Sequence, residues 1–244
     1  GRIHTYEEFL QSYHWAREAG FSNINVDLMF AIPGQTCESW KHNLETVAEL
    51  SPEHISAYSL IIEEGTPFAR KKLILPNEDE EYQMYEDTAE ILRKYGFHQY
   101  EISNYARDSF ECRHNKGYWQ CTEYLGIGLG AASLFQEKRF SNTRDMQTYL
   151  ADSTDPEKIR EDVVELTENN KIEEFMFLGL RMTEGISERQ FERNFGCRIE
   201  DIYGSVLAKY KEMDLLEHAG EFWCFTRKGI HVSNPVLADF LLDE

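Results

Sequence analysis

The spacing of hydrophobic residues over the first hundred positions predicts helices that alternate with strands. Helices are predicted over residues 5–20, 40–50 and 79–95, and strands over 23–30, 55–62 and 100–102. The first and third helices both end at a glycine followed by a phenylalanine, at Gly20-Phe21 and Gly96-Phe97. This alternation implies parallel strands with right-handed crossovers, as in α/β barrels. Because three parallel strands cannot close a barrel, we expect further strands to precede residue 1.

The pattern changes after residue 103. Residues 103–122 have no clear period, and residues 126–133 are a run of small residues where backbone can approach backbone or a ligand. Helices are predicted over 172–182, 187–195 and 199–213, then a hairpin of 215–218 with 222–225 and a helix from about 226. We therefore expect a barrel portion over 1–142, an acidic connector over 143–165, and a small winged-helix-like domain over 166–244.

Net charge and cysteine content limit which partners and which cellular compartment fit the protein. Lys and Arg number 25 against 44 Asp and Glu, and the formal net charge of −19 argues against nucleic acid or an anionic membrane as partner. No apolar run approaches the roughly 18 to 20 residues that span a bilayer. The five cysteines form no C-x-x-C pair, which suits a reducing, cytoplasmic location. The chain begins without Met, so we expect it to be part of a longer protein.

Two carboxylates stand at predicted strands, where α/β barrels place their chemistry. Asp27 is the one acidic side chain of the first strand, and Glu101 ends the last. Each could accept hydrogen bonds from ligand hydroxyls or amines, or could cap a loop or pair with a neighbouring cation. Both interpretations stay open from the residues alone.

The densest group of functional side chains runs from Cys112 to Trp119. A histidine there can ligate iron or move protons, while Tyr and Trp offer flat apolar surface to a planar ligand. A zinc site of Cys112, His114 and Cys121 lacks an evident fourth ligand. A loop anchored by aromatics, without a ligand, is the plain alternative. The glycines at 126, 128 and 130 lack the dinucleotide-binding spacing, which leaves tight strand packing or close contact with a ligand.

Several strings taken together resemble the radical-SAM heme chaperone family, HemW, which is related to the oxygen-independent coproporphyrinogen III oxidases. They are DLMFAIPGQT at 27–36, EGTPF at 64–68, YEISNYA at 100–106, CRHNKGYW at 112–119 and YLGIG at 124–128. The resemblance runs from Arg2 to about Asn142 and more loosely to the C-terminus. It implies the C-terminal half of a partial (β/α)6 radical-SAM barrel followed by a small, mainly helical domain.

The resemblance also implies cofactors. Family members hold a 4Fe–4S cluster on a C-x-x-x-C-x-x-C loop, and S-adenosylmethionine (SAM) chelates the fourth iron. None of the five cysteines has this spacing, so we expect the loop to lie upstream of Gly1 and do not expect this chain to assemble the cluster.

Site residues follow from the same resemblance. It places SAM contacts on Arg2, Asp27, Ile61 and Ala132. It ties the HNxxYW string to heme, with His114 as candidate axial ligand of the heme iron and Asn115, Tyr118 and Trp119 in support.

Three functions are therefore considered. The first is a heme chaperone that binds heme and passes it to an acceptor protein. The second is an oxidase that converts coproporphyrinogen III to protoporphyrinogen IX through a 5′-deoxyadenosyl radical. The third is a protein–protein interaction role for residues 166–244 alone.

Overall fold

The computed structural model describes residues 4–242, and the chain divides into two compact units at Cys112 and Arg113. The first unit contains the helices and strands α1 (Tyr6–Glu18), β1 (Asn25–Phe30), α2 (Cys37–Glu49), β2 (His54–Ser59), α3 (Glu78–Lys94), β3 (His98–Glu101) and β4 (Asn104–Ala106). A capping box begins α1, since Thr5 Oγ1 accepts from the Glu8 amide at 3.3 Å and Glu8 Oε2 accepts from the Thr5 amide at 2.7 Å.

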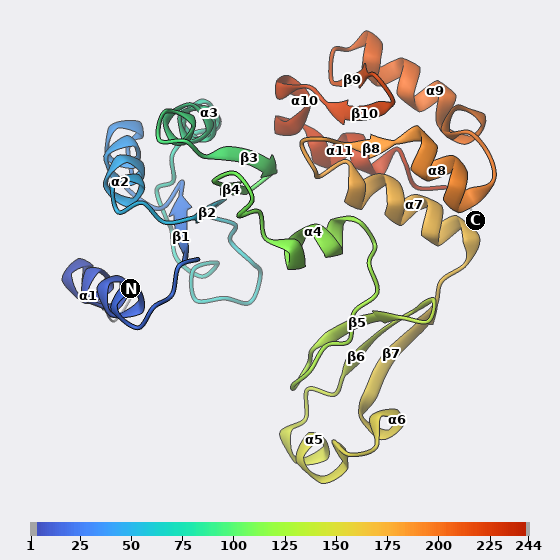
Figure 1. Cartoon of the computed structure of the whole chain (residues 1–244), viewed down its shortest axis with the longest axis horizontal. Helices are drawn as coiled ribbons and strands as arrows, with labels where there is room; N and C mark the ends of the chain where they lie inside the picture. The colour runs from blue at the N-terminus through green and yellow to red at the C-terminus, as the bar shows by residue number, and fades with distance from the viewer. Residues whose placement is uncertain (1–3, 243–244) are drawn as a thin grey trace. The chain divides into compact units, whose positions relative to one another are not determined.

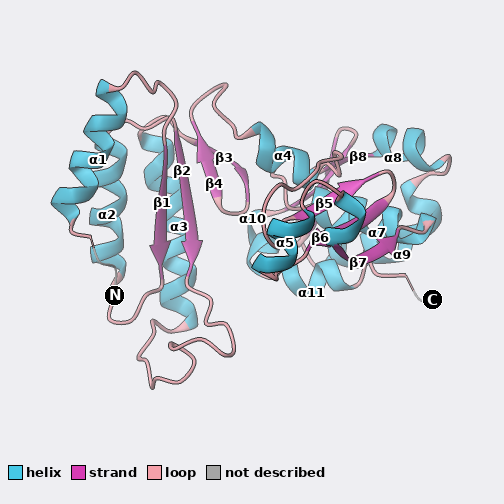
Figure 2. Cartoon of the chain, turned by 90° about the horizontal axis from the view of Figure 1, so that it is seen from below, coloured by secondary structure: helices cyan, strands magenta, loops and turns pink. Residues whose placement is uncertain are grey.

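The sheet of the first unit has the strand order β1-β2-β4-β3. Strands β1 and β2 are parallel, as predicted, and lie side by side in Figures 1 and 2. The third predicted strand, β3, runs in the same direction as β1 and β2, but it does not pair with β2, because the chain reverses at Ile102 and Ser103. The returning strand β4 then pairs antiparallel with both β2 and β3 and separates them.

The core of the first unit joins the two long helices to this sheet. Trp40 and Leu44 of α2 are almost completely buried, as are Ile55 of β2 and Met84 of α3. The Trp40 indole Nε1 donates to the Met84 carbonyl at 3.0 Å and to Thr88 Oγ1 at 2.9 Å. One buried donor therefore fixes how α2 and α3 pack against each other.

The second unit contains many short elements. They are α4 (Arg113–Trp119), β5 (Ala132–Phe135), β6 (Lys138–Asn142), α5 (Met146–Asp152), α6 (Pro156–Ile159), β7 (Arg160–Glu165), α7 (Glu168–Gly179), β8 (Ile186–Ser187), α8 (Glu188–Phe195), α9 (Ile199–Glu212), β9 (Leu216–Ala219), β10 (Phe222–Phe225), α10 (Arg227–His231) and α11 (Ser233–Ala238). The segment 143–165, expected as a connector, is folded here: β7 pairs antiparallel with β6 in a sheet ordered β5-β6-β7. Five of the six β7 residues are exposed, so the sequence shows no alternation of hydrophobic and polar residues that would predict this strand.

The C-terminal part of the second unit has its own core. The hairpin β9–β10 forms where predicted, and β8 joins it in the order β8-β10-β9. Met176, Phe191, Tyr203 and Phe240 are almost fully buried between this sheet and its helices. The mainly helical, winged-helix-like fold expected for this part is present.

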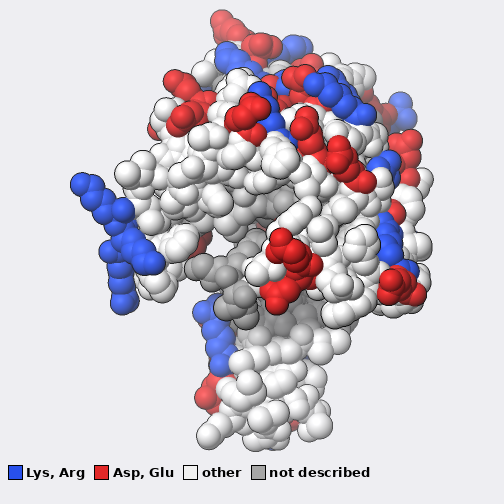
Figure 3. Space-filling view, turned by 90° about the vertical axis from the view of Figure 1, so that its left-hand side faces the viewer, with Lys and Arg blue, Asp and Glu red and all other residues white. Residues whose placement is uncertain are grey.

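Charged side chains lie largely on the surface. Figure 3 shows one face of the molecule, on which Asp and Glu are interspersed with Lys and Arg. The exposed pair of Lys94 and Glu90, at 2.9 Å, is typical, and such pairs contribute about 0–1 kcal/mol. Stability therefore rests on the two apolar cores. Over residues 4–242, none of the helices combines the length and hydropathy of a membrane span.

Candidate functional site

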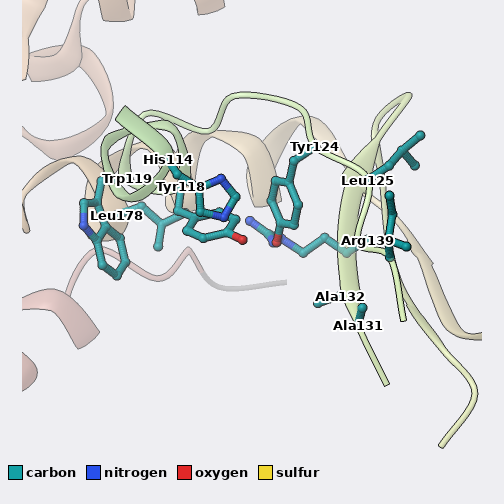
Figure 4. Close-up of a pocket in the computed structure, with 11 residues that line it drawn as sticks. His114, Tyr118, Trp119, Tyr124, Leu125, Ala131, Ala132, Arg139 and Leu178 are labelled. Carbon is teal, nitrogen blue, oxygen red and sulfur yellow. The ribbon is translucent and has the colours of Figure 1, made fainter. Parts of the chain in front are cut away.

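The second unit holds a hollow of about 690 Å³ that brings the densest sequence motif against the small-residue run. Its lining residues are His114, Tyr118, Trp119, Tyr124, Leu125, Gly126, Ile127, Ala131, Ala132, Arg139 and Leu178. Figure 4 shows the rings of His114, Tyr118 and Tyr124 gathered on one side, with Ala132 of β5 and the preceding Ala131 across from them.

The short helix α4 builds the aromatic wall. His114 and Tyr118 are one helical turn apart, so their side chains share a face. Their ring centroids lie 4.5 Å apart, and the ring planes are inclined at 68°. The centroids of Tyr118 and Tyr124 lie 4.6 Å apart, with an interplanar angle of 77°. These edge-to-face contacts hold the three rings as one surface. His114 remains exposed, so its imidazole is available to a ligand.

The opposite wall is backbone. The segment at Tyr124 bridges to Leu134 of β5, which brings Gly126 beside Ala132. A Cβ atom on Gly126 would lie 2.2 Å from the Ala132 carbonyl oxygen, closer than any real contact. Tight strand packing thus explains this glycine, while its place in the lining leaves contact with a ligand open.

Arg139 brings a cation to the lining from β6. Its Nε and Nη2 donate to the two carboxylate oxygens of Glu174 on α7, at 2.5 and 2.9 Å. This hydrogen-bonded pair raises the pKa of the Arg139 guanidinium, against a smaller opposing effect of burial. The arginine is therefore charged at every working pH and its orientation is fixed.

Trp119 forms one end of the hollow. The Arg181 guanidinium lies over its ring, 4.5 Å from the centroid. The indole Nε1 is buried and has no hydrogen-bond partner among residues 4–242. A buried donor without a partner costs about 1–3 kcal/mol.

The predicted SAM contacts are not gathered in one hollow. Arg2 lies outside the described residues. In the first unit, Asp27 lines a hollow of about 280 Å³ between α1, β1 and α2 and accepts from Asn25 Nδ2 at 2.7 Å. Ile61 is 75% exposed and lines another hollow, of about 380 Å³. Ala132 lies in the second unit, in the same hollow as His114.

The predicted heme residues are largely brought together. His114, Tyr118 and Trp119 all line the hollow of the second unit, whereas Asn115 is not among its lining residues. The sequence did not single out Tyr124, Arg139 or Leu178. Tyr124 could have been found from its place in the YLGIG string, but nothing local marks the other two.

The structure also bears on the zinc site and on the role of Glu101 considered from the sequence. Among the residues that the structure describes, no three His, Cys, Asp or Glu side chains could hold a metal ion together, so the zinc alternative at Cys112, His114 and Cys121 was wrong. Burial raises the pKa of the Cys121 thiol to about 11, which further disfavours a thiolate ligand. Glu101 is buried and accepts from the Ser103 amide at 2.9 Å and from Asn104 Nδ2, so it stabilises the turn between β3 and β4.

Comparisons with known proteins place these features in a family context. A family model described as the HemN C-terminal domain matches residues 166–232. The chain is 38% identical to the heme chaperone HemW of Lactococcus lactis, over 100% of this chain and 65% of that protein. It is 36% identical to the heme chaperone HemW of Bacillus subtilis, over 99% of this chain and 65% of the relative. The chain thus spans just under two thirds of the length of these relatives.

A solved structure supports the fold. The coproporphyrinogen III oxidase HemN from Escherichia coli, described as a radical SAM enzyme, superposes with a TM-score of 0.80 at 21% identity. The match covers 98% of this chain and 59% of the oxidase. The mixed α/β fold predicted from the sequence is confirmed. The chain is similar to the HemW proteins over nearly its whole length, and to the HemN C-terminal domain over residues 166–232.

Proposed function

We propose that this chain, a relative of the HemW heme chaperones over its whole length, binds heme in the hollow of its second unit and passes it to an acceptor protein. The observation that carries the proposal is the exposed His114 imidazole at the edge of a wall of aromatic rings. An imidazole nitrogen is a common axial ligand of heme iron. The aromatic faces supply apolar surface for a planar macrocycle.

The chemistry and size of the hollow fit heme. Its volume of about 690 Å³ is within the range of small-molecule sites. The apolar lining of Leu125, Ile127 and Leu178 suits a macrocycle that must leave water. When bound, heme supplies an iron with an open coordination position. In the proposal, His114 offers that iron a nitrogen lone pair, and Asn115, Tyr118 and Trp119 support the histidine, the two aromatic rings as part of the wall of the hollow.

The iron–sulfur cluster does not fit the residues present. The five cysteines lack the C-x-x-x-C-x-x-C spacing, and among the described residues no group of three or more His, Cys, Asp or Glu side chains could hold a metal ion together. We derive no radical step from this chain. SAM contact at Arg2, Asp27, Ile61 and Ala132 stays part of the proposal. Of the four, Asp27 has the clearest chemistry, since its exposed carboxylate can accept from an amino or hydroxyl group.

The chaperone function is favoured over the oxidase function by the relatives. The proteins named heme chaperone HemW match nearly the whole chain at up to 38% identity. The oxidase structure matches at 21% identity, which speaks to fold alone.

Titration of the chain with heme, followed by the Soret band, tests the proposal. We expect saturable binding and a shifted Soret band in the wild-type chain. His114→Ala should bind heme at least about tenfold more weakly, which corresponds to the loss of a contact of about 1.4 kcal/mol. His42→Ala is the matched control, because His42 is exposed on α2 of the other unit. No saturable binding, or equal spectra and affinities in the two variants, would contradict the proposal.

A further inference from the structure

We propose that Arg139 recognises a carboxylate on the ligand, so that the hollow selects planar macrocycles with acidic side chains over their neutral esters. This inference rests on the proposed function and deepens it. Arg139 is the one Lys or Arg among the described lining residues of this hollow. In Figure 4 its side chain extends from β6 past Tyr124, toward Tyr118 and His114.

The pairing of Arg139 leaves donors for a ligand. A guanidinium has five N–H donors, and Glu174 takes one from Nε and one from Nη2. The Arg139 side chain is 33% exposed, whereas Glu174 is only 13% exposed. The carboxylate therefore holds one edge of the guanidinium from the α7 side. The Tyr124 hydroxyl is a further partner, which still leaves N–H donors on this partly exposed group for a ligand.

The fixed orientation favours recognition of a carboxylate. The ion pair with Glu174 already fixes the rotamer of Arg139. A ligand carboxylate therefore meets a preorganised set of donors and loses less side-chain entropy on binding. The same glutamate opposes the ligand, because its negative charge repels a second carboxylate nearby. Arg139 therefore strengthens the binding of an acidic ligand, whereas Glu174 weakens it.

This opposition distinguishes recognition from a structural role. Arg139→Gln and Glu174→Gln both break the same ion pair between β6 and α7. If the pair only stabilised the fold, both substitutions would weaken ligand binding alike. If Arg139 binds a carboxylate, Arg139→Gln weakens binding of the acid and Glu174→Gln does not.

The experiment titrates the full chain with heme and with heme dimethyl ester, in the same detergent. We expect Arg139→Gln to weaken heme binding roughly tenfold, a typical value for a lost hydrogen bond to a charged group, and to leave the ester unchanged. Glu174→Gln should bind heme at least as tightly as the wild type. Arg139→Lys keeps the charge and should retain most of the preference for heme over its ester.

The outcomes separate this inference from the proposed function. If the wild type binds heme but Arg139→Gln loses nothing, or loses heme and ester equally, carboxylate recognition is overturned while heme binding stands. If both glutamine variants weaken heme binding alike, the ion pair is structural and the inference also fails. If the wild type binds neither compound, the proposed function fails and this inference with it. Circular dichroism melting of each variant shows whether a change in binding reflects unfolding.

Discussion

Replacement of Gly126 by alanine tests whether the small-residue run is required for backbone packing. A Cβ at this position would meet the Ala132 carbonyl oxygen at 2.2 Å and the Ala131 Cβ at 2.9 Å. Ordinary contact begins near 3.4 Å, so one strand must retreat by about 1 Å. The obstacle is backbone rather than the flexible end of a side chain, so the strain cannot be relieved by a new rotamer.

The hydrogen bonds around Gly126 determine how much Gly126→Ala should destabilise the second unit. Its amide donates to Ser133 Oγ at 3.0 Å, and its carbonyl accepts from Asn142 Nδ2 at 3.1 Å. Overpacking costs about 1–3 kcal/mol, and each hydrogen bond lost adds about 0.5–1.5 kcal/mol. We expect Gly126→Ala to destabilise the second unit by about 2–4 kcal/mol and to weaken ligand binding in the hollow.

Gly117→Ala provides the matched control. Gly117 lies inside α4, and a Cβ there would meet Thr122 Cβ at an ordinary 3.7 Å. Alanine is favoured over glycine in a helix by about 1 kcal/mol, so this variant should be at least as stable as the wild type. Native-state hydrogen exchange at the Leu134 and Asn142 amides measures both variants locally. Unchanged protection in Gly126→Ala would refute the packing argument.

Three further predictions follow from single groups. Trp40→Phe should destabilise the first unit by about 1–3 kcal/mol in urea denaturation, because the indole donor to Met84 and Thr88 is lost from a buried site, and equal stability would contradict this. Iodoacetamide mapped by mass spectrometry at pH 8 should modify Cys121 and Cys224 last, because burial raises the pKa of both thiols to about 11, and early labelling of either would count against it. At Glu53, burial raises the pKa of the carboxyl, but hydrogen bonds from Arg17 and from the Ile24 amide outweigh it and the net pKa is lowered. This group thus stabilises the fold above its unfolded pKa, and the stability is lost as the pH falls through the lower folded value. Glu53→Gln should therefore cost about 1.5–3 kcal/mol at pH 7 and progressively less below about pH 4, and a pH-independent cost would disprove the assignment.

Local signals in the sequence predicted most helices and their starts. The capping residue Thr5 begins α1 as predicted, and Ser187 accepts from the Gln190 amide at 3.2 Å at the start of α8. Both depend on residues three positions apart, so the sequence alone contains the whole interaction.

The missed elements depend on distant partners. All three residues of β4 are buried, so the strand shows no alternation, and it exists because β2 and β3 pair with it. Five of the six residues of β7 are exposed, and the strand is held by its pairing with β6. Neither has a period of its own in the sequence.

The candidate site divides in the same way. His114 and Tyr118 are one helical turn apart and were predicted as a group. Arg139 and Glu174 are separated by 35 positions, and only the packing of α7 against β6 brings them together. A lone arginine on a predicted strand gives no sign of the hollow it will line.

In the proposed heme complex, His114 presents its imidazole to the heme iron. Hyperfine spectroscopy of the ferric heme complex, prepared with isotope-labelled histidine, measures this contact directly. We expect a coordinated histidine nitrogen in the wild-type chain and in His42→Ala, and its loss in His114→Ala. A coordinated histidine nitrogen that persists in His114→Ala, or none in the wild type, would contradict it.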